Sequence, residues 1–250
     1  MPVQVGKAGT GARKLARKRM KNLTIAVLTL WVISIVSYLI FLTTYRLQPY
    51  IFKLIAAASV GLSIGLIIVL YKYLFSPKEF EEPIDRALRG AAAEEKVSEL
   101  FNGLPPGYAI FNDIPCPMGN IDHIVLGKTG VFVIETKSHQ GEITLSKDGR
   151  LLRDNYPFEK NILKQVMSQC FWLREQLTEP PHKPPFIIPI LVFTDAFVKV
   201  YKPVKNVRIL NKKWVVDNIV HSKASKVNRD QLDRVFYKLL GYQSVNEEQK

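Results

Sequence analysis

The residues of this chain that are best suited to chemistry lie between Asn120 and Lys137. Glu135 and Lys137 stand two positions apart at the end of the apolar run 130–134. Strand side chains alternate between the two faces of a sheet, so this carboxylate and this ammonium group point the same way. Asp122 lies in the preceding strand-like stretch, and a conventional hairpin brings it to the same face. The spacing therefore predicts two carboxylates and a lysine at one end of a sheet.

Such groups are suited to phosphodiester hydrolysis with a divalent metal. Magnesium is usually held by one or two carboxylates together with waters and substrate phosphate, and Asp122 and Glu135 can supply the carboxylates. The metal would activate water and neutralise charge on the phosphate, while Lys137 stabilises developing charge or orients the water. The competing interpretation is an exposed ion pair between Glu135 and Lys137 on an edge strand, which is common and contributes little.

The elements that must position these groups follow from hydrophobic periodicity and turn residues. We expect a helix at 85–102, strands at 108–114, 120–126 and 130–137, a hairpin around Asp148-Gly149, a helix at 159–177 and a buried strand at 186–193. A strand at 207–210 and helices at 212–220 and 228–240 follow. This order predicts an α/β domain with a mixed central sheet flanked by helices.

These motifs resemble the nuclease-related domain family, a branch of the PD-(D/E)xK nuclease superfamily. The similarity spans about residues 90–200. It rests on the following segments: Gly130-Val131-Phe132-Val133-Ile134-Glu135-Thr136-Lys137, Ala93-Glu94-Glu95-Lys96-Val97, Ile121-Asp122-His123, Gly141, and Asn161 to Gln165. The chain departs from the family at Ala93, where glycine is usual, and at Ile162, where proline is usual.

The resemblance implies a restriction-endonuclease-like core in which the catalytic residues gather at one end of the sheet. They are Glu94, Asp122, Glu135 and Lys137, with Gln165 from the next helix. Asp122 and Glu135 are then the expected magnesium ligands, and Glu94 is a further ligand or a partner of one. Gln165 is equally compatible with a solvated helix face.

Other reactive side chains have simpler explanations. His123 follows Asp122 and points to the opposite strand face, which favours a hydrogen-bonded structural histidine over a metal ligand. Cys116 belongs to no recognisable catalytic triad. The chain has only two cysteines, Cys116 and Cys170, and we interpret both as reduced thiols, because two are too few for a disulfide scaffold.

Basic charge dominates the chain, with a formal net charge of +13, which favours anionic partners such as nucleic acid or acidic lipid. A late basic stretch interleaves lysines with apolar residues: Lys199, Lys202, Lys205, Arg208, Lys212 and Lys213 with Val200, Tyr201 and Val204. This stretch is suited to a phosphate backbone, and a solvated lysine-rich loop is an equally good interpretation.

Two long apolar runs near the N-terminus predict a transmembrane helical hairpin at 23–75, with spans at about 23–43 and 54–75. The tail 1–22 is strongly basic, so the positive-inside bias places it in the cytoplasm, and two crossings return the rest of the chain to the same side. A cleaved signal peptide is the alternative, but the first run is longer than a usual signal core and a second run follows.

Together these features predict a basic cytoplasmic tail at 1–22, the hairpin at 23–75, a linker at 76–89 and a nuclease-related domain at 90–250. The expected function is that of a membrane-anchored, cytoplasm-facing, magnesium-dependent nuclease in DNA processing. Its expected partners are nucleic acid, with DNA favoured, and membrane lipid through two helices. The alternative is a catalytically silent module that binds nucleic acid or another partner at the membrane.

Overall fold

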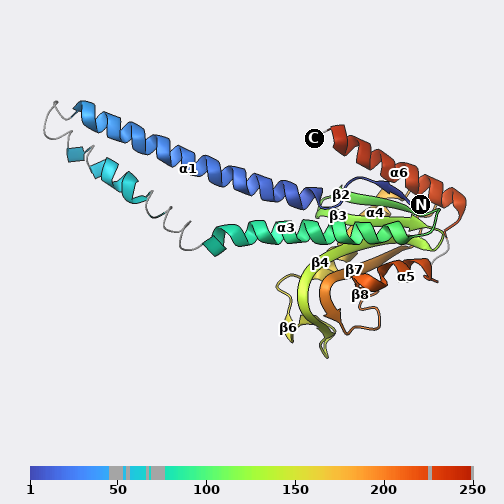
Figure 1. Cartoon of the computed structure of the whole chain (residues 1–250). Coiled ribbons are helices and arrows are strands. Elements are labelled where there is room, and N and C mark those ends of the chain that lie inside the picture. Colours follow the sequence, from blue (N-terminus) through green and yellow to red (C-terminus); the bar gives the residue numbers. More distant parts are fainter. Residues whose placement is uncertain (45–52, 55–56, 66–67, 69–76, 225–226, 249–250) are drawn as a thin grey trace. The chain divides into compact units, whose positions relative to one another are not determined.

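The computed structural model describes residues 1–44, 53–54, 57–65, 68, 77–224 and 227–248 (Figure 1). The chain divides into two compact units. The first contains Met1–Gly11 and Arg89–Lys250, and the second contains Ala12–Leu88. The candidate site lies in the first unit.

The second unit contains most of helix α1 (Thr10–Thr44). The part Thr10–Ile40 is long and apolar enough to cross a membrane, and its most apolar stretch is not buried by other parts of the protein. This agrees with the first expected span. Half of the second expected span, 54–75, lies outside the described residues, which in this range are 54, 57–65 and 68. The two-helix hairpin therefore stays a prediction.

A mixed eight-stranded sheet forms the centre of the first unit. Its strands are β1 (Val3–Val5), β2 (Ala109–Cys116), β3 (Gly119–Gly127), β4 (Gly130–Leu145), β5 (Leu151–Arg153), β6 (Tyr156–Pro157), β7 (Ile187–Val198) and β8 (Arg208–Asn211). Strands β2 to β6 follow one another with antiparallel pairing. Parallel pairs join β1 to β2, β4 to β7 and β7 to β8.

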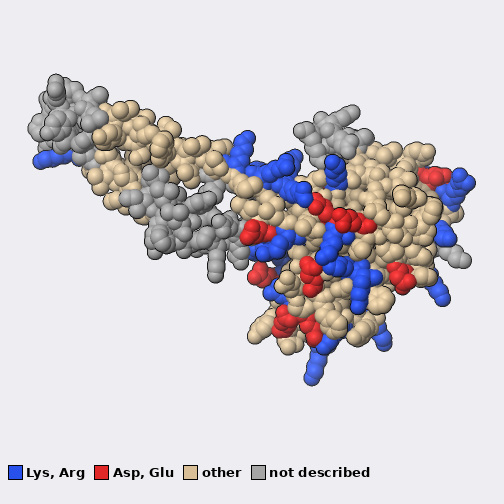
Figure 2. All heavy atoms as spheres, viewed as in Figure 1, with Lys and Arg blue, Asp and Glu red and all other residues tan. Residues whose placement is uncertain are grey.

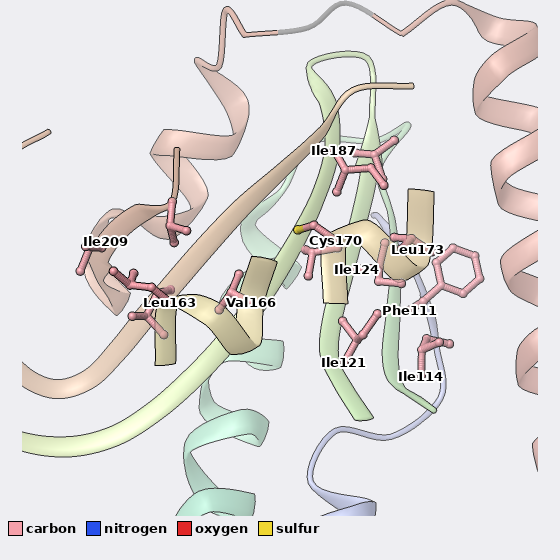
Figure 3. Close-up of a cluster of buried hydrophobic side chains, with 14 of the residues drawn as sticks. Phe111, Ile114, Ile121, Ile124, Leu163, Val166, Cys170, Leu173, Ile187 and Ile209 are labelled. Atoms are coloured by element: carbon pink, nitrogen blue, oxygen red, sulfur yellow. The ribbon is translucent and has the colours of Figure 1, made fainter. Parts of the chain in front are cut away.

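Helices cover both faces of this sheet, as expected for an α/β domain. They are α3 (Pro77–Leu100), α4 (Ile162–Gln176), α5 (Val215–Val220) and α6 (Arg229–Glu248), with short 3-10 helices η1 (Phe101–Gly103) and η2 (Lys212–Trp214). On one face, side chains of α4 and α6 pack against β2, β3 and β4, and Figure 3 shows part of this cluster. On the other face, Val97 of α3 and Val215 and Ile219 of α5 pack against the sheet.

Most expected elements are present, and the differences lie at their ends. The hairpin turn between β3 and β4 is confirmed by the pairing of Gly127 with Gly130. Helix α3 begins at Pro77, so the expected linker at 76–89 is largely helical. Strand β4 continues to Leu145, well beyond the expected end at Lys137, because β7 pairs with it along its length.

The N-terminal tail also differs from expectation. Residues Val3–Val5 form an edge strand that pairs in parallel with Ala109–Phe111 of β2. Helix α1 begins at Thr10, so much of the basic tail is helical. The tail is thus partly built into the α/β unit, and its lysines and arginines gave no sign of this in the sequence.

Candidate active site

The core of the site is a pair of side chains on one face of β4. Glu135 and Lys137 point to the same side, and Lys137 Nζ donates to Glu135 Oε1 at 2.5 Å. Glu135 is 3% exposed and Lys137 is partly buried. The competing interpretation of an exposed ion pair is therefore wrong. In a buried site an unpaired charge is costly, so removing either side chain would leave the other charge unfavourably buried.

Helix α4 supplies two glutamines to the same carboxylate. Asn161 caps this helix by accepting from Lys164 N, which fixes where its first turn begins. Gln165 Nε2 donates to Glu135 Oε1 at 2.7 Å, and Gln165 Oε1 accepts from Lys137 Nζ at 3.3 Å. The structure thus places Gln165 in the cluster, against the interpretation of a solvated helix face.

Gln169 is a member of the cluster that sequence reasoning missed. It is fully buried, and its Nε2 donates to Glu135 Oε2 at 2.8 Å and to the Asn120 carbonyl at 3.1 Å. Residues four apart lie on one face of a helix, so the spacing of Gln165 and Gln169 was an available signal. Between them the two amides and Lys137 satisfy both oxygens of Glu135.

Asp122 lies beside Glu135 on the neighbouring strand. The register that pairs His123 with Ile134 places Asp122 directly opposite Glu135. Asp122 Oδ2 accepts from the backbone N–H of Thr136 at 2.6 Å. Burial raises the pKa of Asp122 well above its usual range, and the negative charges of Glu135 and Glu94 raise it further, while the Thr136 hydrogen bond opposes them.

Glu94 reaches the same group of charges from α3. Burial, followed by the charges of Asp113 and Glu135, raises the pKa of Glu94 to about 7, while a hydrogen bond from the Gly9 backbone and the charge of Lys137 act in the opposite direction. The expected acidic residues therefore interact electrostatically. The mutual repulsion of Glu94, Asp122 and Glu135 is only partly balanced by the positive charge of Lys137.

Asp113 is a further carboxylate that the sequence did not single out. It lies between Asn112, which pairs with His123, and Ile114, which pairs with Ile121. Its Oδ2 accepts from the Thr10 hydroxyl and from Gly11 N, and its Oδ1 accepts from Asn120 Nδ2 at 2.6 Å. Asp113 therefore caps the first turn of α1, and its charge also acts on Glu94.

The neighbouring His123 and Cys116 take structural places. His123 is fully buried on the other face, where its Nδ1 lies 2.8 Å from Asn112 Oδ1 and its ring packs edge-on against Phe101. Burial lowers its pKa to about 3, so it is neutral near pH 7. The expectation of a structural histidine is confirmed. Burial also raises the pKa of the Cys116 thiol, which disfavours the nucleophilic thiolate.

The carboxylates of the site could hold a metal ion only as a pair. Among the residues that the structure describes, no three His, Cys, Asp or Glu side chains come close enough together to hold one ion. Magnesium commonly takes only one or two carboxylates and completes its shell with water and phosphate. The adjacent pair Asp122 and Glu135 fits that requirement, and the raised pKa values of Asp122 and Glu94 mark a place where a cation would relieve repulsion.

These features define a class of domain, one that gathers buried carboxylates, a lysine and two glutamines on one face of a mixed sheet. Residues 89–194 match the family model described as nuclease-related domain, which confirms the resemblance seen in the sequence. The match includes Glu94, Asp122, Glu135, Lys137 and Gln165. No match is found among curated proteins or among solved structures.

Proposed function

We propose that the chain is a metal-dependent nuclease with a restriction-endonuclease-like core. The observation that carries the proposal is the buried cluster in which Lys137, Gln165 and Gln169 all donate to Glu135. A solvated charge pair needs no such support. Buried polar networks of this kind are costly to build, and they are typical of sites whose side chains must keep one geometry.

Asp122 and Glu135 would hold a magnesium ion. Glu94 would act as a further ligand or would contact one of the ligands. When bound, magnesium supplies a polarised phosphate and a more acidic water. The chain's own residues do the rest. Gln165 and Gln169 orient Glu135, the Thr136 backbone orients Asp122, and Lys137 is free to exchange its contact with Glu135 for a phosphate oxygen.

The proposed setting is the cytoplasmic side of a membrane, with α1 as an anchor. Support comes from its length and apolar exposed surface and from the basic residues around its start. The positive-inside bias then favours a cytoplasmic N-terminus. The second span and the return of the chain to the same side are part of this proposal, and so is DNA as the substrate.

One observation favours a second candidate, a catalytically silent nucleic-acid-binding module. Both oxygens of Glu135 already accept hydrogen bonds from side chains, so a metal must compete with Lys137 or an amide for them. In a silent module these hydrogen bonds to Glu135 would remain in place whether or not magnesium is present. The two candidates differ in whether magnesium changes the site.

The test is DNA cleavage by the full-length chain in detergent micelles, with magnesium or with EDTA. We expect cutting with magnesium only, and its loss in Glu135→Gln and Lys137→Met. Glu175→Gln is the matched control, because Glu175 is an exposed carboxylate on α4, the helix that carries Gln165 and Gln169. Cutting by Glu135→Gln at the wild-type rate would refute the site, and binding without cutting in wild type would favour the silent module.

A further inference from the structure

Three aromatic side chains are exposed at and beyond the end of β7. Phe197 is 62% exposed, Tyr201 87% and Trp214 55%. Large aromatic side chains are usually well buried, and several of them on one part of a surface commonly mark an interaction site. None of these three contributes to either hydrophobic cluster of the α/β unit.

The three rings belong to one region of the fold, although they are far apart in sequence. Phe193 of β7 pairs with Asn211, and Asn211 Nδ2 donates to the Ala196 carbonyl at 2.8 Å. These bonds fix the start of η2, which contains Trp214, beside the end of β7. Figure 1 shows β7 and β8 side by side, with α5 following them. Tyr201 lies on the connection between the two strands.

Lysines contact two of these rings: Lys199 Nζ lies 5.8 Å from the Phe197 ring centroid, and Lys213 lies over Trp214. Lys202, Lys205 and Lys212 belong to the same segments of the chain, and Lys96 reaches β7 from α3. Asp195 pairs with Lys96 and Lys212, and Glu142 pairs with Lys199. Lys202, Lys205 and Lys213 form no salt bridge with a carboxylate of the described residues, so the region keeps excess positive charge. Figure 2 shows lysine and arginine atoms spread across the visible face, with carboxylates between them.

Two of these lysines are held in defined positions. Val204 and Val207 exchange backbone hydrogen bonds of 2.9 Å, which closes a two-residue turn with Lys205 at its tip. Lys205 has a φ of 50° and Asn206 one of 66°, as this kind of turn requires. Lys213 lies over the Trp214 ring, with its Nζ 5.2 Å from the ring centroid. A preorganised cation loses less conformational entropy when it binds a phosphate.

This aromatic and basic surface begins next to the candidate active site. The parallel pairing of β4 and β7 places Lys137 opposite Phe193, four residues before Phe197, and Thr194 Oγ1 donates to the Lys137 carbonyl at 3.5 Å. The next residue, Asp195, carries the ion pairs with Lys96 and Lys212. A strand bound along this surface would thus reach the proposed site.

We propose that Phe197, Tyr201 and Trp214, with the lysines around them, bind a single-stranded segment of nucleic acid and lead it to the carboxylate site. The inference rests on the proposed nuclease function and names its substrate class. Exposed rings stack on unpaired bases of any sequence, whereas the bases of a duplex are already stacked on one another. Anionic lipid would also attract lysines and aromatic rings, but the pairing of β7 with Lys137 of β4 favours a substrate of the site.

The test uses the full-length chain in micelles with EDTA, so that binding is measured without cleavage. Fluorescence anisotropy would compare a labelled oligothymidine with a duplex of the same length. We expect tighter binding of the single strand, and a weakening of roughly 5- to 100-fold for Tyr201→Ala or Trp214→Ala. The matched control is Tyr237→Ala on α6, which is 69% exposed and distant in sequence from the surface, and we expect it to bind as wild type.

The lysines give a second measurement. Lys202→Gln combined with Lys205→Gln should lower the slope of log affinity against log salt by about 1.4, since each single-strand phosphate contact contributes about 0.7. Unchanged affinity in both aromatic variants, or equal affinity for duplex, would overturn the inference. The inference would also be overturned if Tyr201→Ala and Trp214→Ala lost binding to phosphatidylserine vesicles but bound the oligonucleotide as wild type does.

The outcome is separable from that of the proposed function. Single-strand binding that depends on Tyr201 and Trp214, without cutting in magnesium, would uphold this surface and reject the nuclease. Cutting that needs Glu135 but is unaffected by Tyr201→Ala and Trp214→Ala would uphold the nuclease and reject this surface.

Discussion

Replacing Glu94 by glutamine should stabilise the metal-free protein at alkaline pH. Burial and neighbouring carboxylates raise the pKa of Glu94 from 4.5 to about 7. The folded protein therefore keeps this proton in a pH range where the unfolded chain releases it. The contribution of Glu94 to stability is complete below pH 4.5, falls as the pH rises towards 7 and stays low above that value.

The magnitude follows from the shift. Each pKa unit corresponds to about 1.4 kcal/mol, so a rise from 4.5 to about 7 lowers the free energy of unfolding by about 3 kcal/mol at pH 8. Glutamine is neutral at every pH, similar in shape, and keeps an oxygen that can accept the hydrogen bond from the Gly9 backbone. We expect Glu94→Gln to gain up to about 3 kcal/mol at pH 8 and almost nothing at pH 4.

Urea unfolding of the full-length chain in micelles would measure this, with EDTA present and with the fluorescence of Trp172 and Trp214 as the signal. Glu99→Gln is the matched control, because Glu99 is an exposed carboxylate on the same helix. It should leave the pH dependence unchanged. If Glu94→Gln were as pH-dependent as wild type, or less stable at pH 8, the electrostatic description of the site would be wrong.

Three further substitutions test how the site is supported. Gly9→Ala should cost more than 1 kcal/mol, because Gly9 has a φ of +73° and an added Cβ would lie 2.8 Å from the Ala91 carbonyl oxygen. Gly90→Ala, in the open on α3, should instead gain about 0.5 to 1 kcal/mol, and equal effects at the two glycines would contradict the packing of the N-terminal segment on α3. Thr136→Val should be neutral or stabilise by about 1 kcal/mol without loss of cutting, because the buried Thr136 Oγ1 has no hydrogen-bond partner among the described residues. Thermal unfolding measures all three, and a clear loss of stability in Thr136→Val would show that the hydroxyl has a partner.

Local patterns were sufficient to predict the face that carries Glu135 and Lys137. Alternation along an apolar strand fixes relative side-chain direction, and the Gly127 to Gly130 turn fixes the neighbouring strand. That register places Asp122 opposite Glu135, as the hairpin pairing required. These inferences succeeded because both strands are buried, where a shift by one residue would turn every apolar side chain outward.

Gln169 and Asp113 could not be singled out in the same way. Gln169 lies on a helix that is polar on several sides, and only its burial against Glu135 distinguishes it from the other polar residues of α4. Asp113 has a φ of 59°, which interrupts the regular strand at a point where its carboxylate turns to Thr10 and Gly11. For Gln169 the four-residue spacing from Gln165 was a local signal, but its contact with Glu135 joins residues far apart in the chain. The role of Asp113 depends on such distant contacts alone, which no local pattern encodes.

The N-terminal segment shows most clearly how a sequence can indicate one property and conceal another. Its lysines and arginines led to a prediction about membrane topology, which stays a prediction, and they gave no sign that Val3–Val5 pairs with β2 or that Gly11 N donates to Asp113. Asp113 bonds Asn120, whose carbonyl accepts from Gln169, and Gln169 in turn holds Glu135. A continuous chain of hydrogen bonds therefore runs from the first turn of α1 to the proposed metal ligand. Because Asp113 caps the first turn of α1 and also bonds Asn120, we expect a change at the start of α1 to affect the support of Glu135.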